Sequence, residues 1–136
     1  MATHRRRHAE MRIAMDTSIL MAPVETGVRL FDELDRLVGN YEAVVPEVVR
    51  DELAALSRGR GEEARAASVG LDLADRCEPV TTDESYADDA LVALADRGEV
   101  DAVATNDAPL RNRVLAAGVP VIHIRGQTQL TRTQPN

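Results

Sequence analysis

The sequence contains no lysine, no tryptophan and a single cysteine, Cys77. One cysteine excludes a disulfide framework and any zinc site built from several cysteines. Aromatic residues make up 2% of the chain, which is too few for the extended base-stacking platforms of single-strand-binding proteins. No apolar run approaches the roughly 20 residues needed to cross a bilayer, so we expect no membrane association and cytoplasmic residence.

The charge balance is acidic, because 23 Asp and Glu residues outnumber 16 basic residues, all of them arginine, and give a net charge of −7. Carboxylates stay hydrated where salt screening is strong, so this composition is typical of halophilic, archaeal proteins. A GC-rich genome would also favour arginine over lysine. The composition argues against a broad basic patch for nucleic acid, but not against a small RNA site whose positive charge comes from metal ions.

The length of 136 residues and the hydrophobic content of 44% predict one domain with a proper core. We expect an N-terminal extension over residues 1–10, the domain over residues 11–125, and a polar C-terminal tail over residues 126–136. No internal repeat or low-complexity block interrupts the domain.

Short apolar runs alternate with amphipathic stretches along the domain. The expected strands cover residues 11–15, 41–45, 100–104 and 119–124, with a short strand near residue 80. The expected helices cover residues 28–38, 46–57, 62–76, 86–96 and 107–117. This order predicts an α/β fold with a mostly parallel central sheet flanked by helices on both faces. Sites in such sheets form at the carboxyl ends of the strands.

Two aspartates follow expected strands. Asp16 closes the first strand and is followed by Thr17, and Asp107 follows the strand over residues 100–104 and precedes Pro109. Both positions are site candidates at a strand end. Both would equally suit a helix N-cap, where Asp is common.

Two further acids are candidates by their spacing. Glu52 is four residues after Val48 and four before Leu56, so we expect it to share the buried stripe of its helix. An unpaired carboxylate there costs several kcal/mol, which a metal ion or an arginine would offset. The alternative is a glutamate at the edge of the stripe that reaches solvent.

The helix that begins near residue 86 opens with Asp88 and Asp89. Asp88 is in register with the apolar residues Leu91 and Ala95, so we place it in the site, with Asp89 as an auxiliary residue on the outer face. The helix dipole favours acids in a first turn, so a purely structural role is the alternative for either.

Four carboxylates meeting at one sheet edge would select Mg²⁺ or Mn²⁺ over zinc. Two such ions about 3.5–4 Å apart would activate a water molecule against a phosphodiester. We therefore expect metal-dependent hydrolysis that leaves a 5′-phosphate and a 3′-hydroxyl.

At these residues the chain resembles the PIN-domain nucleases over nearly its whole length. The matching segments are Asp16-Thr-Ser18, Val45-Pro46 with Glu52-Leu53, Tyr86 to Val92, Ala104 to Arg113, and Val119-Pro-Val121. The resemblance implies a Rossmann-like three-layer PIN domain and divalent-metal endoribonuclease activity. It implies that the metal ligands and catalytic residues are Asp16, Glu52, Asp88 and Asp107. It also implies that Thr17, Thr105 and Asn106 help to orient phosphate or a ligand carboxylate.

The segments Tyr86 to Val92 and Ala104 to Arg113 resemble most the PIN branch that processes ribosomal RNA and its archaeal relatives. The expected substrate is therefore a ribosomal RNA precursor. Alternatives are a VapC-type toxin ribonuclease or a non-catalytic scaffold for RNA or protein. Candidate partners are a second copy of the chain, an antitoxin or a ribosome-assembly protein.

Three other α/β functions do not fit the motifs. A HAD-type phosphatase needs a second Asp two residues after Asp16, where this chain has Ser18, and usually a lysine. A phospho-receiver domain lacks its lysine and its early acidic pair here. A dinucleotide-binding domain needs a glycine-rich turn after the first strand, and none is present.

Overall fold

The computed structural model describes residues 10–136; residues 1–9, which make up most of the expected N-terminal extension, lie outside the described residues. One sheet has the strand order β3-β2-β1-β4-β5-β6. Its strands are β1 (Met11–Met15), β2 (Tyr41–Pro46), β3 (Glu78–Val80), β4 (Ala102–Ala104), β5 (Val121–Arg125) and β6 (Gln129–Thr133). Neighbouring strands are parallel except β5 and β6, which are antiparallel. The predicted α/β class is confirmed.

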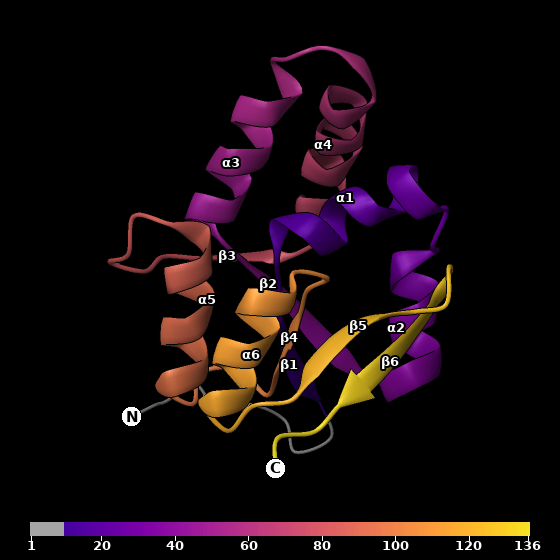
Figure 1. The fold of residues 1–136 in the computed structure, drawn as a ribbon. Coiled ribbons are helices and arrows are strands. Elements are labelled where there is room, and N and C mark those ends of the chain that lie inside the picture. Colours follow the sequence, from indigo (N-terminus) through magenta and orange to yellow (C-terminus); the bar gives the residue numbers. More distant parts are fainter. Residues whose placement is uncertain (1–9) are drawn as a thin grey trace.

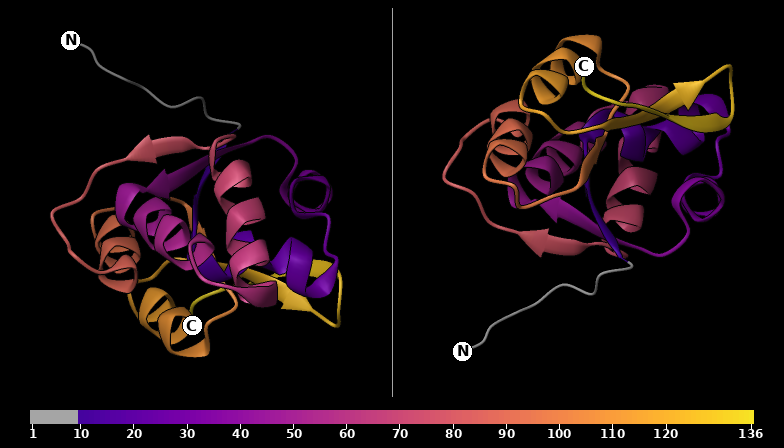
Figure 2. Two further views of the ribbon diagram at one scale, coloured as in Figure 1. Left: turned by 90° about the horizontal axis from the view of Figure 1, so that it is seen from above. Right: turned by 90° about the horizontal axis from the view of Figure 1, so that it is seen from below.

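Helices lie on both faces of this sheet, as predicted. They are α1 (Thr17–Thr26), α2 (Leu30–Val38), α3 (Glu47–Ser57), α4 (Gly61–Ala74), α5 (Ala87–Asp96) and α6 (Ala108–Ala116). Helices α1, α3 and α4 gather beyond the ends of β1 and β2 (Figure 1). Helices α5 and α6 lie on one side of the sheet and α2 on the other (Figure 2). Within residues 10–136 no helix is long and apolar enough to cross a membrane.

The strand order reverses between β1 and β4. The chain builds outward from β1 to β3, then returns across the sheet to place β4 on the other side of β1. In doubly wound sheets, the crevice at this reversal is where ligands bind. The register sets Met15 opposite Ala104, so Asp16 and Thr105 leave the sheet side by side.

The two central strands are buried on both faces. Every residue of Ile13–Met15 and Ala102–Ala104 has no exposed surface. Such strands are continuous apolar runs in the sequence, which is why both were predictable. The first polar residue after each strand, Asp16 and Thr105, is buried as well.

The structure differs from the expected elements in two places. Helix α1 was not predicted, and residues 129–133, expected within a polar tail, form strand β6. The tail prediction is wrong for these residues because Leu130 is buried against the core while the backbone pairs with β5. The other expected helices and strands begin and end within two residues of the observed ones.

Candidate active site

Asp16 sits at the reversal point of the sheet. Its backbone N–H donates to the carbonyl oxygen of Ala104 at 3.0 Å, which joins the ends of β1 and β4. Asp16 is the N-cap residue of α1, and Asp107 is the N-cap residue of α6. Neither side chain caps its helix by a hydrogen bond. Capping, the structural alternative for both, therefore does not account for these carboxylates.

Two hydroxyl groups hold the buried carboxylate of Asp16 by one oxygen. Thr105 Oγ1 donates to Asp16 Oδ2 at 2.6 Å, and Ser18 Oγ donates to the same atom at 2.8 Å. Asp16 is 4% exposed and Thr105 is fully buried. Among residues 10–136, no hydrogen bond to Asp16 Oδ1 accompanies these two. The side chain is therefore fixed while its second oxygen stays available to a ligand.

The same hydroxyls also order the loop that follows β4. Thr105 Oγ1 accepts the backbone N–H of Asp107 at 3.0 Å, and Ser18 Oγ accepts that of Asn106 at 3.0 Å. Asn106 Oδ1 accepts the backbone N–H of Ile124 at 2.9 Å, which ties the loop to β5. The loop that carries Asp107 is thereby held to α1 and to the sheet at once.

Glu52 is an exposed residue on α3, and the prediction that it shares the buried stripe is wrong. The buried residues of α3 are Val49 and Leu53, so Glu52 lies one position beside that stripe. Its carboxylate is nevertheless oriented, because Thr17 Oγ1 donates to Glu52 Oε1 at 2.6 Å. The partner of this glutamate is thus a threonine at the start of α1.

Asp88 shows that the four acids share one region. Its pKa is raised, first by burial and then by the negative charges of Asp16, Asp107 and Glu52. The cation of Arg113 acts in the opposite direction and only partly offsets them. Three carboxylates from other parts of the chain are therefore close enough to Asp88 to oppose its ionisation.

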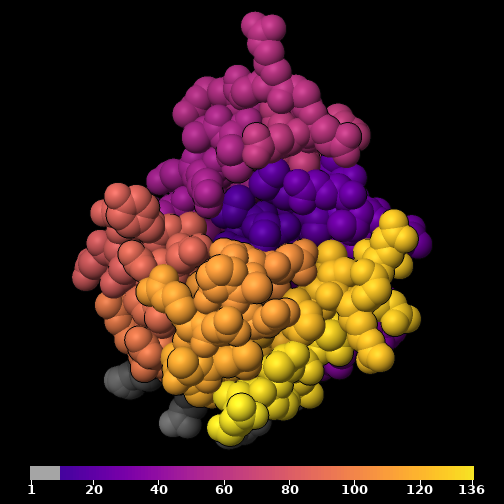
Figure 3. Space-filling view, viewed as in Figure 1, coloured from indigo at the N-terminus to yellow at the C-terminus, as the bar shows by residue number. Residues whose placement is uncertain are grey.

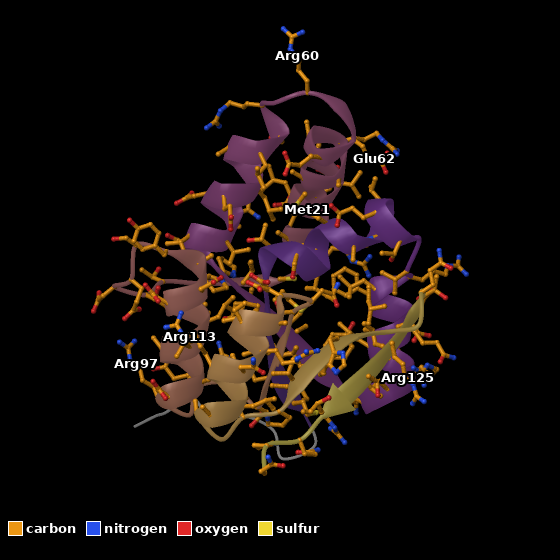
Figure 4. The ribbon with its side chains drawn as sticks, in the orientation of Figure 1. Met21, Arg60, Glu62, Arg97, Arg113 and Arg125 are labelled. Carbon is orange, nitrogen blue, oxygen red and sulfur yellow. The ribbon has the colours of Figure 1, made fainter. Side chains whose placement is uncertain are left out.

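Asp89, the next residue along α5, pairs with Arg113. Its Oδ1 accepts a hydrogen bond from Arg113 Nη2 at 3.0 Å, and both side chains are about half exposed (46% and 48%). Arg113 extends from α6 toward α5 (Figure 4). The preference for Asp88 over Asp89 as the main metal ligand stays a prediction.

A cleft of about 630 Å³ opens beside the acids, between α3 and the start of α5. In Figure 3, indigo atoms from the N-terminal part of the chain are visible between the α3–α4 pair and helices α5 and α6. The lining residues are Val48, Asp51, Glu52, Ser85, Tyr86, Ala87, Asp88, Asp89 and Arg113.

The donor chemistry of the four acids fits a hard divalent cation. All their donor atoms are carboxylate oxygens, which Mg²⁺ and Mn²⁺ prefer, and a cation would offset the repulsion that raises the pKa of Asp88. As the side chains stand, no group of three or more His, Cys, Asp and Glu residues within 10–136 could hold a metal ion. Binding would therefore need these side chains to draw closer together.

Sequence reasoning missed Ser18 as a site residue. Its role depends on helix α1, which turns Ser18 Oγ back toward Asp16 and toward the N–H of Asn106. A hydroxyl residue two positions after a strand-end aspartate was the available signal. It could be interpreted only after α1 was placed.

Comparison with known proteins shows the family to which this chain belongs. A family model described as "PIN like domain" matches residues 13–127. The chain belongs to the PIN-like domain family. The predicted resemblance to PIN proteins is thereby confirmed, and the domain described above is a PIN-like domain.

Individual relatives are distant. The chain is 27% identical over 118 residues to Ribonuclease VapC4 of Methanocaldococcus jannaschii. The matched region covers 84% of this chain and 90% of that protein. The PIN domain endonuclease Utp24 superposes with a TM-score of 0.73 at 23% identity, covering 90% of this chain and 92% of that chain. A domain of a functionally unknown M. jannaschii protein gives a TM-score of 0.63 at 14% identity, covering 85% and 92%.

Proposed function

We propose that this PIN-like domain is an endoribonuclease that hydrolyses RNA phosphodiester bonds with divalent metal ions, in the processing of ribosomal RNA. The proposal depends on one observation: Asp16 and Asp107 do not cap their helices but share a charged region with Asp88 and Glu52. The names of two relatives support it, since one is a ribonuclease and the other a PIN domain endonuclease.

The four acids are the proposed metal ligands, and neighbouring hydroxyl groups orient two of them. Asp16, Asp88, Asp107 and Glu52 would hold Mg²⁺ or Mn²⁺, two ions in our proposal. Such ions, when bound, supply the positive charge that lowers the pKa of an attacking water and stabilises the leaving oxygen. Ser18 and Thr105 fix Asp16, and Thr17 fixes Glu52. Hydroxyl groups behind metal ligands hold them in the productive orientation.

The RNA backbone needs positive charge beside these acids. Arg113 supplies a half-exposed guanidinium close enough to lower the pKa of Asp88. Its pairing with Asp89 is a surface salt bridge, worth about 0–1 kcal/mol, so a phosphate can compete for it. Helix α1 begins beside the same acids with no side-chain cap, and uncapped N–H groups favour an anion there.

The decisive test is the variant Asp16→Asn with a structured ribosomal RNA precursor and Mn²⁺. Asparagine keeps one side-chain oxygen for the hydroxyls of Ser18 and Thr105, but it replaces the other oxygen by an amide nitrogen that cannot bind a cation. We expect a folded protein without detectable cleavage. Gel analysis of end-labelled RNA gives the rate, and thermal melting checks the fold.

Asp96→Asn is the matched control, because Asp96 is an exposed acid at the far end of α5. This variant should cleave at the wild-type rate and leave 5′-phosphate ends. Full cleavage by Asp16→Asn would disprove the metal-site proposal. Wild-type protein that binds the precursor without cutting it would leave the non-catalytic scaffold as the better description.

A VapC-type toxin is the second candidate function, favoured by the similarity to Ribonuclease VapC4. A toxin should arrest growth when it is expressed alone, and a small protein from the neighbouring gene should relieve the arrest. A processing nuclease should instead co-sediment with pre-ribosomal particles and leave growth unaffected. Both measurements use Asp16→Asn as the inactive control.

A further inference from the structure

Tyr86 is an exposed ring beside the acids. With 73% of its surface accessible, it is the one large hydrophobic side chain classed as exposed in the described part of the chain. It is the N-cap residue of α5, two positions before Asp88, and its side chain does not cap the helix. Neither burial nor capping therefore accounts for an aromatic residue at this position.

The other two aromatic residues are occupied elsewhere. The guanidinium of Arg76 lies 4.0 Å from the centroid of the Phe31 ring. Tyr41 is partly buried at the start of β2, and its hydroxyl donates to the carbonyl oxygen of Phe31 at 3.5 Å. Of the two tyrosines and one phenylalanine in the chain, only Tyr86 is largely exposed, whereas Phe31 and Tyr41 are partly buried.

Tyr86 also lines the cleft of about 630 Å³ that contains Glu52 and Asp88. Glu52 and Asp88 belong to the acid group as well, so the cleft and the proposed cutting site are adjacent. Arg113 lines this cleft too and is the residue we propose for a backbone phosphate. The carboxylates of the cleft instead accept hydrogen bonds from the amino groups of bases. The cleft therefore suits a base next to the phosphate that Arg113 would bind.

We propose that Tyr86 stacks on an unpaired base of the RNA, next to the phosphodiester that the acids cleave. The proposal rests on the proposed ribonuclease function and narrows its substrate to single-stranded or looped RNA. A base within a helix is covered on both faces by its neighbours, so it reaches a protein ring only after leaving the stack.

Tyrosine fluorescence tests the stacking directly, because the chain has no tryptophan. The variant Tyr41→Phe leaves Tyr86 as its only fluorescent tyrosine. The variant Tyr86→Phe leaves Tyr41 as its only fluorescent tyrosine. Each variant is titrated with a single-stranded hexaadenylate in Ca²⁺, and the length of the RNA is checked afterwards. We expect quenching in Tyr41→Phe and none in Tyr86→Phe, while fluorescein-labelled hexaadenylate binds both equally by anisotropy.

Affinity gives the second measurement. Tyr86→Ala should weaken binding of the labelled hexaadenylate by about 5- to 150-fold, the range for losing one base-stacking ring, whereas Tyr86→Phe should keep it. A fully paired duplex of the same length should neither quench Tyr86 nor lose affinity in Tyr86→Ala.

Binding without quenching in Tyr41→Phe would overturn the proposal, and so would wild-type affinity in Tyr86→Ala. If Tyr86→Ala instead only changed the size of the protein on gel filtration, the ring would belong to a protein contact and the proposal would be wrong. Quenching by hexaadenylate together with no cleavage of any RNA would support the base site and refute the nuclease function. The two failures are therefore distinguishable.

Discussion

The hydroxyl group of Thr105 links the end of β1 to the loop after β4. Its hydroxyl donates to Asp16 Oδ2 and accepts the N–H of Asp107, so one buried group positions both aspartates. A hydroxyl is suited to this because it donates and accepts at once. The arrangement makes Thr105 a positioning residue for the proposed metal ligands.

Replacing Thr105 by valine should therefore affect stability and metal affinity together. Valine keeps the shape but leaves the N–H of Asp107 without its acceptor, which should cost about 1–3 kcal/mol of unfolding free energy. Asp16 loses its shorter donor, and loss of a group behind a metal ligand typically reduces metal affinity about 10- to 100-fold. Urea unfolding and calorimetric titration with Mn²⁺ measure the two effects.

Thr105→Ser is the matched control, because it keeps the hydroxyl and removes only a buried methyl group. It should retain Mn²⁺ affinity while losing some stability to the small cavity. Equal Mn²⁺ affinities for the valine variant and the wild type would show that Asp16 needs no hydroxyl to hold it, or does not bind the ion.

The sequence predicted where the candidate acids lie along the chain but not the contacts that hold them. Asp16 and Asp107 were predictable because each follows an apolar strand, and strand ends converge in a parallel sheet. The burial of Glu52 was wrongly predicted. Helical spacing places Glu52 on the same side of α3 as Val48 and Leu56, but both of these residues are themselves only partly buried. Ser18 depends on helix α1, so no pattern around it could reveal its contacts with Asp16 and Asn106.

At the scale of elements, α4 approaches α1 closely at Gly70. A Cβ atom on Gly70 would lie 2.9 Å from the carbonyl oxygen of Leu20 and 3.2 Å from Leu53 Cδ2. Leu20 is buried within α1, the helix that carries Thr17 and Ser18 into the site. The backbone of α1 therefore cannot move aside without disturbing those residues.

Gly70→Ala should destabilise the protein, although alanine favours helix formation. The propensity gain is about 1 kcal/mol, while forcing a methyl group into a packed contact costs about 1–3 kcal/mol and here meets backbone rather than a flexible side chain. Because the contact is with backbone, we take the upper end of that cost and expect a net loss of about 2 kcal/mol by urea unfolding. Ser68→Ala, on the exposed face of the same helix, should change stability by less than about 0.5 kcal/mol. A Gly70→Ala variant as stable as the wild type would contradict the close approach.

The two elements absent from the sequence prediction lack the patterns that such prediction uses. In α1, Ile19, Leu20, Met21 and Ala22 are all buried, so there is no polar face to give a helical period, and Pro23 within the helix resembles a break. Strand β6 contributes only Leu130 to the core, so its alternation is too weak to stand out from a polar tail. Tertiary contacts, not local preference, specify both.

At the scale of the whole molecule, the acids of the site are part of a general excess of negative charge. The formal charge of −7 in 136 residues means that folding gathers like charges into a smaller volume. Ion pairs such as Arg12–Glu42 and Arg50–Asp75 offset some of it, but exposed pairs contribute little. The remaining repulsion favours the unfolded chain, in which the charges lie further apart.

Salt should therefore raise the melting temperature of this protein at neutral pH. Screening shortens the reach of each charge from about 30 Å at 0.01 M salt to about 3 Å at 1 M, so repulsion in the folded state is largely removed. We expect melting temperature to increase from 0.01 M to 1 M KCl at pH 7, measured by calorimetry without divalent ions. The internal control is the same series at pH 5, close to the sequence pI of about 4.9, where net repulsion vanishes and the increase should largely disappear. An increase of the same size at both pH values would assign the effect to salt acting on apolar surface, and a decrease at pH 7 would mean that local ion pairs outweigh the net charge.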